Sequence, residues 1–461
     1  MCAIAGAFNV TNASYVISLM LKAMQHRGQE AAGIVSCDGG VFHEHKGFGL
    51  ADEVFGGIDV AARLPGTAAV GHLRYATSGD PDSPESIQPL SASLRSGTVA
   101  IVHNGNLTNY RERRRELEEL GAIFASGSDT ELFLHLMARS RGDDVTARLA
   151  DAFGHTEGAW SLLVLTKDAI HAAVDPLGFR PLAVAKMGDG FLFASETCAF
   201  DLLNVRPSLP IGPGRIVATS VAGQASTRYA SPAFTRRCSF EHIYFTRPDS
   251  HAFGVSSNDV RERLGSLLAA RAPVAADLVT AVPDSSNAVA LAYAEALGVP
   301  FKFALIRNHY TGRTFITPKQ TARELGVRMK LNAVRSVVQG KSVVVVDDSL
   351  VRGTTAAKVA ALLKDAGARA VHLRIGSPPV IHPCFWGIDT SRRSELAAAS
   401  ASPDELGKAL GLDSLAYLTV DDLRAALGDE AGSAYCTTCF TARPPADAPD
   451  VPVGDLLKDR S

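Results

Sequence analysis

The chain has few of the features that mark membrane proteins, disulfide-rich proteins or nucleic-acid-binding proteins. Its 461 residues contain no apolar run close to the roughly 20 residues that a membrane-spanning helix needs. It has only seven cysteines, an odd number that is too small for a disulfide scaffold. The 46 Lys and Arg residues are balanced by 48 Asp and Glu residues, which gives no positive surplus for nucleic acid or acidic lipid. We therefore expect a cytoplasmic protein whose working cysteines are nucleophiles or metal ligands.

The two halves of the chain differ in pattern. The first half alternates short apolar runs with turns, and it contains helical segments at residues 14–25 and after Ser128-Asp129, a pair that is typical of a helix cap. The second half alternates strand-like runs with helical patterns, which indicates a parallel sheet with helices on both faces. We predict a domain at residues 2–230, a second domain at 231–442 and a loose tail at 443–461, rich in Pro and Asp.

The start of the chain suggests an N-terminal nucleophile. Once Met1 is removed, the thiol of Cys2 lies beside its own α-amine, which can act as the general base. A cysteine at position 2 is by itself most often a chance occurrence. The polar clusters that follow it in the sequence make chance a poor explanation.

Four polar clusters each follow an apolar run, at residues 26–30, 71–75, 103–106 and 128–131. Together they contain what amide hydrolysis of glutamine requires. The Asn104-Gly105 pair offers a side-chain N–H and a backbone N–H for an oxyanion hole. An Arg can bind the substrate carboxylate through two hydrogen bonds, and an Asp can bind its ammonium group. Any one cluster could be a turn or a cap, but four of them after an N-terminal cysteine favour a site.

On these motifs the first half resembles the class II, or N-terminal-nucleophile, glutamine amidotransferase domains. The resemblance implies an αββα sandwich, and it implies the roles of six residues: Cys2 as nucleophile, Asn104 and Gly105 as oxyanion hole, and Arg27, Arg74 and Asp129 at the glutamine site, with Arg27 ordering the pocket. Two residues depart from the family pattern, since Ala3 replaces a glycine and Ala76 replaces a serine. We expect the extra methyl group beside the nucleophile to slow glutamine hydrolysis.

A nine-residue polar run at 347–355 follows the apolar strand at 343–346 and leads into a helix. Two carboxylates at a strand end can hold hydroxyls or Mg²⁺, and the Gly-Thr-Thr segment before the helix can bind a phosphate through its N–H groups. A strand–turn–helix with Asp and Thr as simple caps is the alternative. The whole run resembles the phosphoribosyl diphosphate (PRPP) loop of type I phosphoribosyltransferases. The resemblance implies that PRPP is bound by Asp347, Asp348, Ser349, Arg352, Gly353, Thr354 and Thr355. It also implies that Mg²⁺ is bound by Ser285, Asp347 and Asp348.

Two further segments belong to this second predicted site. Residues 282–287 stand where the family has its diphosphate loop, with Ser286 in place of the usual glycine. Residues 307–318 are long, polar and basic. They suit either a lid over an anionic substrate or a solvated loop.

The remaining cysteines fall into two groups. Cys436 and Cys439 form a C-x2-C pair, which indicates a metal site or a redox pair, whereas Cys238 and Cys384 are isolated in the sequence. Four thiolates could bind zinc or a [4Fe–4S] cluster, and the residues alone leave this choice open. We expect two others, Cys37 and Cys198, to be packing residues.

As a whole, residues 2–442 resemble the iron–sulfur type of the amidophosphoribosyltransferase family. This resemblance implies a [4Fe–4S] cluster on Cys238, Cys384, Cys436 and Cys439, a bound Mg²⁺, glutamine and PRPP as substrates, and a homotetramer with no nucleic-acid or membrane partner. The reaction would give 5-phosphoribosylamine, glutamate and diphosphate, the first committed step of purine synthesis. We weighed three alternatives: a paralogue in specialised nucleoside metabolism, a non-catalytic PRPP-binding regulator, and an amidotransferase acting on a sugar phosphate.

Overall fold

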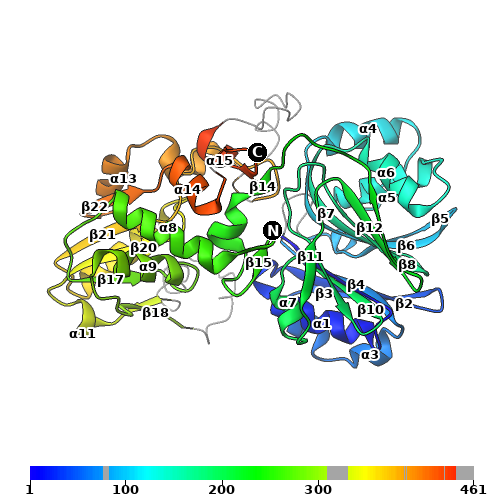
Figure 1. Cartoon of the computed structure of the whole chain (residues 1–461), viewed down its shortest axis with the longest axis horizontal. Coiled ribbons are helices and arrows are strands. Elements are labelled where there is room, and N and C mark those ends of the chain that lie inside the picture. Colours follow the sequence, from blue (N-terminus) through cyan, green and yellow to red (C-terminus); the bar gives the residue numbers. More distant parts are fainter. Residues whose placement is uncertain (76–81, 309–330, 389, 391, 430, 443–461) are drawn as a thin grey trace.

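The computed structural model describes residues 1–75, 82–308, 331–388, 390, 392–429 and 431–442. Ala76, most of the expected lid at 307–318 and the tail at 443–461 lie outside the described residues. The chain forms two lobes, with the first half on the right of Figure 1 and the second half on the left. The N-terminus lies at the junction between them (Figure 1), where Met1 packs into a core cluster made mainly by the second half.

The first half contains two antiparallel sheets that pack face to face. The seven-stranded sheet has the order β11 (Pro207–Pro210), β9 (Ala183–Met187), β10 (Gly190–Ala194), β1 (Ala3–Phe8), β4 (Ala68–Arg74), β2 (Ala31–Asp38) and β3 (Val41–Phe48). The six-stranded sheet has the order β13 (Gly223–Arg228), β12 (Arg215–Ser220), β8 (Ala169–Val174), β7 (Gly158–Leu165), β6 (Gly97–Leu107) and β5 (Leu90–Leu94).

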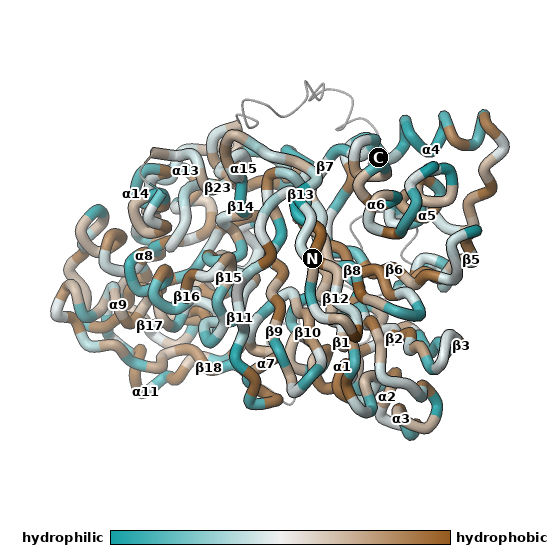
Figure 2. The backbone as a smooth tube through the Cα atoms, turned by 45° about the vertical axis from the view of Figure 1, so that its right-hand side comes forward, coloured by the Kyte–Doolittle hydropathy of each residue, from teal (hydrophilic) through white to brown (hydrophobic). Residues whose placement is uncertain are grey.

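Helices cover the outer faces of both sheets. Strand β1 shows why its residues suit this arrangement, because Ile4 and Phe8 fill the core between the sheets while Ala3, Ala5 and Ala7 leave room for a helix on the other face. That helix is α1 (Ala13–Ala23); α5 (Thr130–Arg139) and α6 (Val145–Phe153) cover the six-stranded sheet. The remaining helices are α2 (Ala51–Phe55), α3 (Val60–Arg63), α7 (Cys198–Asp201) and α4 (Tyr110–Glu119), which is hydrophilic along most of its length (Figure 2). The predicted αββα sandwich is confirmed.

The second half is built on a four-stranded parallel sheet with the order β17 (Leu278–Ala281), β20 (Ser342–Asp347), β21 (Ala370–Ile375) and β22 (Ser414–Tyr417). One face packs against α8 (Ser257–Arg271), α9 (Asn287–Leu297) and α14 (Val420–Leu427), and the other against α12 (Thr354–Asp365) and α13 (Pro403–Ala409). The predicted parallel α/β domain is therefore confirmed. Because the strands are parallel, their carboxyl ends share one edge of the sheet, where ligands of open α/β folds bind.

Short elements join and flank these layers. They are the two-stranded pairs β14 (Arg237–Cys238) with β23 (Tyr435–Cys436), β15 (His251–Ala252) with β16 (Val255–Ser256) and β18 (Leu305–Arg307) with β19 (Leu331–Ala333), and the helices η1 (Gln25–Arg27), η2 (Pro84–Ser86), η3 (Glu241–Phe245), α11 (Arg335–Val338), η4 (Arg393–Glu395), η5 (Ala397–Ala399) and α15 (Thr438–Thr441). The predicted boundary at residues 230 and 231 falls between β13 and β14. None of the described helices is both long and apolar enough to span a membrane.

We expect the core between the two sheets to hold the sandwich together. Leu163 on β7 is fully buried there, so Leu163→Ala removes packed methyl groups and should lower the free energy of unfolding by about 2–5 kcal/mol. Val221→Ala is the matched control, because Val221 is 84% exposed and its truncation should change stability little. Chemical denaturation of both variants measures the difference. Equal stabilities of the two variants would contradict this account of the core.

Candidate active sites

Cys2 lies immediately before β1, the central strand of the seven-stranded sheet. It is 8% exposed, and its thiol donates a hydrogen bond to the carbonyl oxygen of Tyr75 at 3.6 Å. Burial raises the pKa of the thiol, while the nearby charges of Asp129 and Arg74 act on it in opposite directions. The structure therefore brings three of the predicted glutamine-site residues together. A buried thiol with a raised pKa needs a base before it can attack an amide.

Asn104 and Gly105 are near the end of β6, beside β4. The two strands meet where His72 Nε2 lies 3.2 Å from the carbonyl oxygen of His103. The Nδ2 atom of Asn104 is buried and has no hydrogen-bond partner among the described residues. At Gly105 a side chain would collide with the carbonyl oxygen of Ala159 on β7, which explains the glycine. A buried, unused N–H donor is what an oxyanion hole requires.

Asp129 precedes α5, but its side chain does not cap that helix. The expected cap is therefore wrong in detail, although α5 begins where the sequence predicted. The carboxylate instead accepts a hydrogen bond from the Leu107 backbone N–H at 2.9 Å, and lies 3.6 Å from His103 Nδ1. These contacts turn Asp129 toward β6 and the oxyanion-hole residues. Glu131 holds the preceding loop by accepting hydrogen bonds from the backbone of Ala125 and from Ser126.

Arg27 occupies a different place from Arg74 and Asp129. It is 1% exposed, and its Nε donates to the carbonyl oxygen of Cys2 at 3.1 Å. Its other nitrogens donate to the carboxylates of Glu196 and Glu241. The guanidinium thus contacts the backbone of the nucleophile. This position suits ordering of the pocket rather than contact with glutamine.

The second predicted site lies at the carboxyl edge of the parallel sheet. Asp347 ends β20, and Gly353, with a φ of 75°, directly precedes α12. Because that φ is in the left-handed region, glycine is the residue that fits there. Burial raises the pKa of Asp347 well above its usual value, and the charge of Asp348 adds to the effect. Burial also raises the pKa of Asp348. Two adjacent carboxylates, with Asp348 buried and Asp347 partly buried, can bind a cation.

Ser286 joins the two loops of this site. Its hydroxyl is fully buried, donates to Asp347 Oδ1 at 2.9 Å and accepts from the Asp348 backbone N–H at 3.0 Å. Ser285 hydrogen-bonds the Asp348 carboxylate as well. The serine that replaces the family glycine therefore fixes the carboxylate pair to the 282–287 loop. This contact could not be read from the sequence.

Two basic residues at this edge pair with carboxylates from other elements. Arg352 lies 2.8 Å from Glu395 in η4, and Arg307 lies 3.1 Å from Asp284 in the 282–287 loop. All four side chains are at least 38% exposed. Such exposed ion pairs contribute little to stability, so both arginines can turn to an anionic ligand.

The four cysteines predicted as cluster ligands converge near the junction of the two halves. Strands β14 and β23 pair Cys238 with Cys436. Burial raises the pKa of Cys238 to about 12, and the neighbouring thiols of Cys384 and Cys436 also act on it. Burial raises the pKa of Cys439 well above its usual value, with the other three thiols adding to the effect. Each thiol is thus within electrostatic reach of the others.

The spacing of these thiols bears on which metal group they fit. Within the described ranges no three His, Cys, Asp or Glu side chains lie close enough together to hold a single metal ion. A set of four cysteine sulfurs is a donor set for zinc as well as for an iron–sulfur cluster.

Comparison with known proteins identifies the family of each half of the chain. The glutamine amidotransferase domain family matches residues 72–201, and the phosphoribosyl transferase domain family matches residues 259–375. The amidophosphoribosyltransferase of Bacillus subtilis is 43% identical over 450 residues, which cover 97% of this chain and 94% of the relative. The chloroplastic enzyme of Glycine max is 45% identical over 97% of this chain and 78% of its own. The chain belongs to the amidophosphoribosyltransferase family.

Solved structures of the family share the whole fold. The B. subtilis glutamine PRPP amidotransferase, solved with ADP and GMP, superimposes with a TM-score of 0.91 at 43% identity, covering 96% of this chain and 97% of that one. An allosteric regulatory enzyme of purine biosynthesis gives 0.92 at 42% identity, covering 98% and 97%. As an amidophosphoribosyltransferase, the enzyme transfers the amide nitrogen of glutamine to PRPP, the first step of purine biosynthesis.

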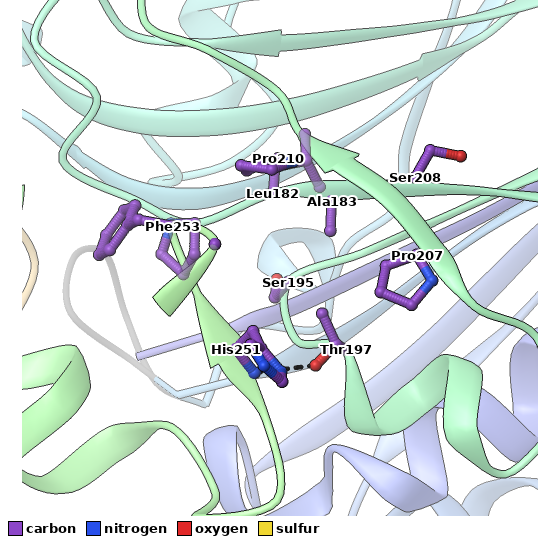
Figure 3. A pocket seen from close by; sticks show the side chains of 11 residues that line it. Leu182, Ala183, Ser195, Thr197, Pro207, Ser208, Pro210, His251 and Phe253 are labelled. Carbon is purple, nitrogen blue, oxygen red and sulfur yellow. Dashed lines mark hydrogen bonds between the residues drawn. The ribbon is translucent and has the colours of Figure 1, made fainter. Parts of the chain in front are cut away.

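A separate cavity of about 220 Å³ lies where β9 and β11 meet β15 (Figure 3). Two of its polar wall groups are already used: Ser195 Oγ accepts from the Ile4 N–H, and Thr197 Oγ1 accepts from the His251 N–H. None of the predicted catalytic or substrate-binding residues lines it. The cavity is therefore distinct from both candidate reaction sites.

Two residues that contact the candidate glutamine site escaped the sequence analysis. Glu196 and Glu241 are buried acids that hold Arg27. Glu241 stands three residues after Cys238. A charged residue within an apolar segment was the one available signal. Cys37 and Cys198 are buried, as packing residues should be.

The loop before Asp129 should depend on the charge of Glu131. Burial alone would raise its pKa, but hydrogen bonds from His135, Ser126 and Ala125 lower it to about 2 from an ordinary 4.5. The charged form therefore stabilises the fold above about pH 4.5, and this stabilisation is lost as the pH falls toward 2. Glu131→Gln should lower the free energy of unfolding by about 1–3 kcal/mol at pH 7 and by less near pH 3. Urea denaturation at both values measures it.

Glu118→Gln is the control for this pH comparison, since Glu118 forms an exposed pair with Arg114 on α4. The Glu118→Gln substitution should leave the free energy of unfolding nearly unchanged at both pH values. A Glu131→Gln cost that stayed constant between pH 7 and pH 3 would contradict the role given to the carboxylate.

Proposed function

We propose that the enzyme runs its two half-reactions at the two sites described above, with Cys2 as the nucleophile of the first. The observation that carries this assignment is the unpartnered Asn104 amide buried beside the strand that ends at Arg74, close to Cys2. Attack of the Cys2 thiol on the glutamine side-chain amide forms a tetrahedral oxyanion, which Asn104 and the Gly105 N–H stabilise. Collapse gives a thioester and releases ammonia; water then releases glutamate.

The base for this step is the α-amine that removal of Met1 exposes on Cys2. In the structure the Met1 amine is deeply buried, and burial, together with the charges of Arg27 and Arg180, lowers its pKa to about 5. Burial favours the neutral form of an amine, which is the form that accepts a proton. Arg74 and Asp129 then hold the carboxylate and the ammonium of glutamine, as opposite charges at a buried site can.

In the second half-reaction, ammonia attacks C1 of PRPP and displaces diphosphate, giving 5-phosphoribosylamine. Asp347 and Asp348 bind the ribose hydroxyls, while Ser349, Arg352, Gly353, Thr354 and Thr355 bind the 5-phosphate at the start of α12. Oxygen ligands from Ser285, Asp347 and Asp348 suit Mg²⁺, which when bound supplies positive charge to the leaving diphosphate. Passage of ammonia from the first site to the second without release to water keeps it unprotonated.

We also propose that Cys238, Cys384, Cys436 and Cys439 bind a [4Fe–4S] cluster. Its support is the set of four thiols, one buried and three partly buried, that act on one another electrostatically. Bound there, the cluster would supply covalent cross-links between β14, β23, α15 and the 382–386 segment. We infer a structural role, because the proposed reaction moves no electrons.

Three broader features complete the proposal. Residues 2–230 and 231–442 form the two catalytic units, since the sandwich ends with β13 and the core of the second half begins with Cys238 in β14. Seven unpaired cysteines suit a reducing compartment such as the cytoplasm. A homotetramer is supported by the family resemblance, and light scattering of the purified protein measures it.

The nucleophile assignment predicts a clean separation of the two half-reactions. Cys2→Ala should abolish glutamine-dependent formation of phosphoribosylamine and glutamate, because the attacking sulfur is gone. Ammonia-dependent turnover of Mg-PRPP should remain, because that site is intact. Diphosphate release with glutamine and with ammonium chloride measures both. Cys37→Ala, at a buried packing position, is the control and should keep both activities. Full glutamine activity in Cys2→Ala would overturn the assignment.

The cluster assignment predicts the colour and metal content of the protein. Anaerobically purified enzyme should be brown, with broad sulfide-to-iron absorbance in the visible and iron and acid-labile sulfide in equal amounts. Cys384→Ser should lose the absorbance, and Cys37→Ala should keep it. Stoichiometric zinc without iron in the wild-type protein would show that the thiols bind a different metal.

A further inference from the structure

We propose that Glu241, a residue of the second half, is a positioning residue for the glutamine half-reaction in the first half. The proposal rests on the assignment of Cys2 as the nucleophile. Glu241 touches no substrate; it acts through Arg27, which holds the carbonyl oxygen of Cys2. A side chain of the second half therefore completes the glutamine site of the first half.

The contacts form a continuous chain from one half to the other. Arg27 donates from Nη2 to Glu241 Oε1 at 2.9 Å and from Nη1 to Glu241 Oε2 at 3.0 Å, which is a two-pronged ion pair. The Nε of the same guanidinium donates to Cys2 O at 3.1 Å. A planar guanidinium fixed on one side by a carboxylate is also fixed on the other side. The position of the Cys2 peptide group thus depends on Glu241.

Glu241 itself is held firmly by the second half. It opens η3, and its Oε2 accepts a hydrogen bond from Thr246 Oγ1 at 3.0 Å. Arg261 on α8, which is 1% exposed, donates to the carbonyl oxygens of His242 and Thr246. These bonds fasten both ends of η3 to a long helix of the parallel-sheet domain. The carboxylate is therefore a fixed point rather than a mobile surface charge.

The charges around Arg27 balance within a buried group. Arg27, Arg180, Glu196 and Glu241 are each at most 1% exposed, and they comprise two cations and two anions. The carboxylates of Glu241 and Glu196 raise the pKa of Arg27, which stays charged in spite of its burial. Removing one partner from such a group leaves an unpaired buried charge. With Glu241 neutralised, Arg27 would shift toward Glu196 and away from the Cys2 carbonyl.

The expected result follows from which contacts are lost. Displacement of a nucleophile by about 1 Å can cost on the order of 100-fold in rate. The Arg74 and Asp129 contacts for glutamine binding do not pass through Glu241, so binding should change less than the chemical step. Glu241→Gln should lower kcat with glutamine tenfold or more, change KM for glutamine less than threefold, and leave ammonia-dependent turnover within twofold of wild type.

The experiment compares three variants of the full-length enzyme. Steady-state kinetics with glutamine, and separately with ammonium chloride, give kcat and KM at saturating Mg-PRPP. Glu241→Asp is the second variant, because it keeps the buried charge yet shortens the reach by one methylene; it should show the same selective loss even if the Gln variant folds poorly. Glu262→Gln on the exposed side of α8, where the Glu262 carboxylate accepts a hydrogen bond from Asn258, is the control and should match wild type.

Each outcome decides between positioning and packing. Loss confined to glutamine kcat in either Glu241 variant supports the proposal. A parallel loss of ammonia-dependent turnover would assign Glu241 to general folding, and unchanged glutamine kcat in both variants would show that Cys2 needs no contact from the second half. The nucleophile assignment fails separately, through glutamine use by Cys2→Ala. The two failures are therefore distinguishable.

Discussion

The buried guanidinium of Arg27 imposes the constraint on which the rest of the molecule depends. A charge in that position costs several kcal/mol unless partners surround it, and one partner, Glu196, comes from the first half while another, Glu241, comes from the second. Arg27 thus links the two halves near the N-terminus of the chain. Because Cys2 O is the remaining acceptor of Arg27, the same constraint places the nucleophile. Domain packing and the glutamine site are consequences of one interaction.

The second site shows the opposite electrostatic arrangement. Asp347 and Asp348 are adjacent carboxylates; Ser286 Oγ lies 2.9 Å from Asp347 Oδ1, and Ser349 Oγ donates to Asp348 Oδ1 at 2.7 Å. This leaves a deficit of positive charge, which a cation and the hydroxyls of a ribose can satisfy. The glutamine site balances its charges internally, whereas the PRPP site is left to be balanced by its ligand. The near-zero net charge of the chain is therefore compatible with an anionic substrate, because the charges that matter are local.

Much of the fold could be predicted because local patterns and tertiary packing agree. The strand at 342–347 and the helix at 354–365 lie close to where the sequence predicts them. Asn104-Gly105 and the 347–355 loop could be predicted as site residues because each follows an apolar run, and Cys2 because it stands second in the chain. What the sequence could not show is pairing between distant residues. Nothing near Glu241 in the chain points to Arg27, which is 214 residues away.

The central claim is that nitrogen released at Cys2 reaches PRPP inside the protein. Glutamine labelled with the heavy nitrogen isotope at its amide, supplied with Mg-PRPP and an excess of unlabelled ammonium at neutral pH, tests it most directly. Mass spectrometry of the trapped phosphoribosylamine measures the isotope in the product. This account predicts that nearly all of the product carries the label. Dilution of the label to the ratio in the surrounding solution would contradict it.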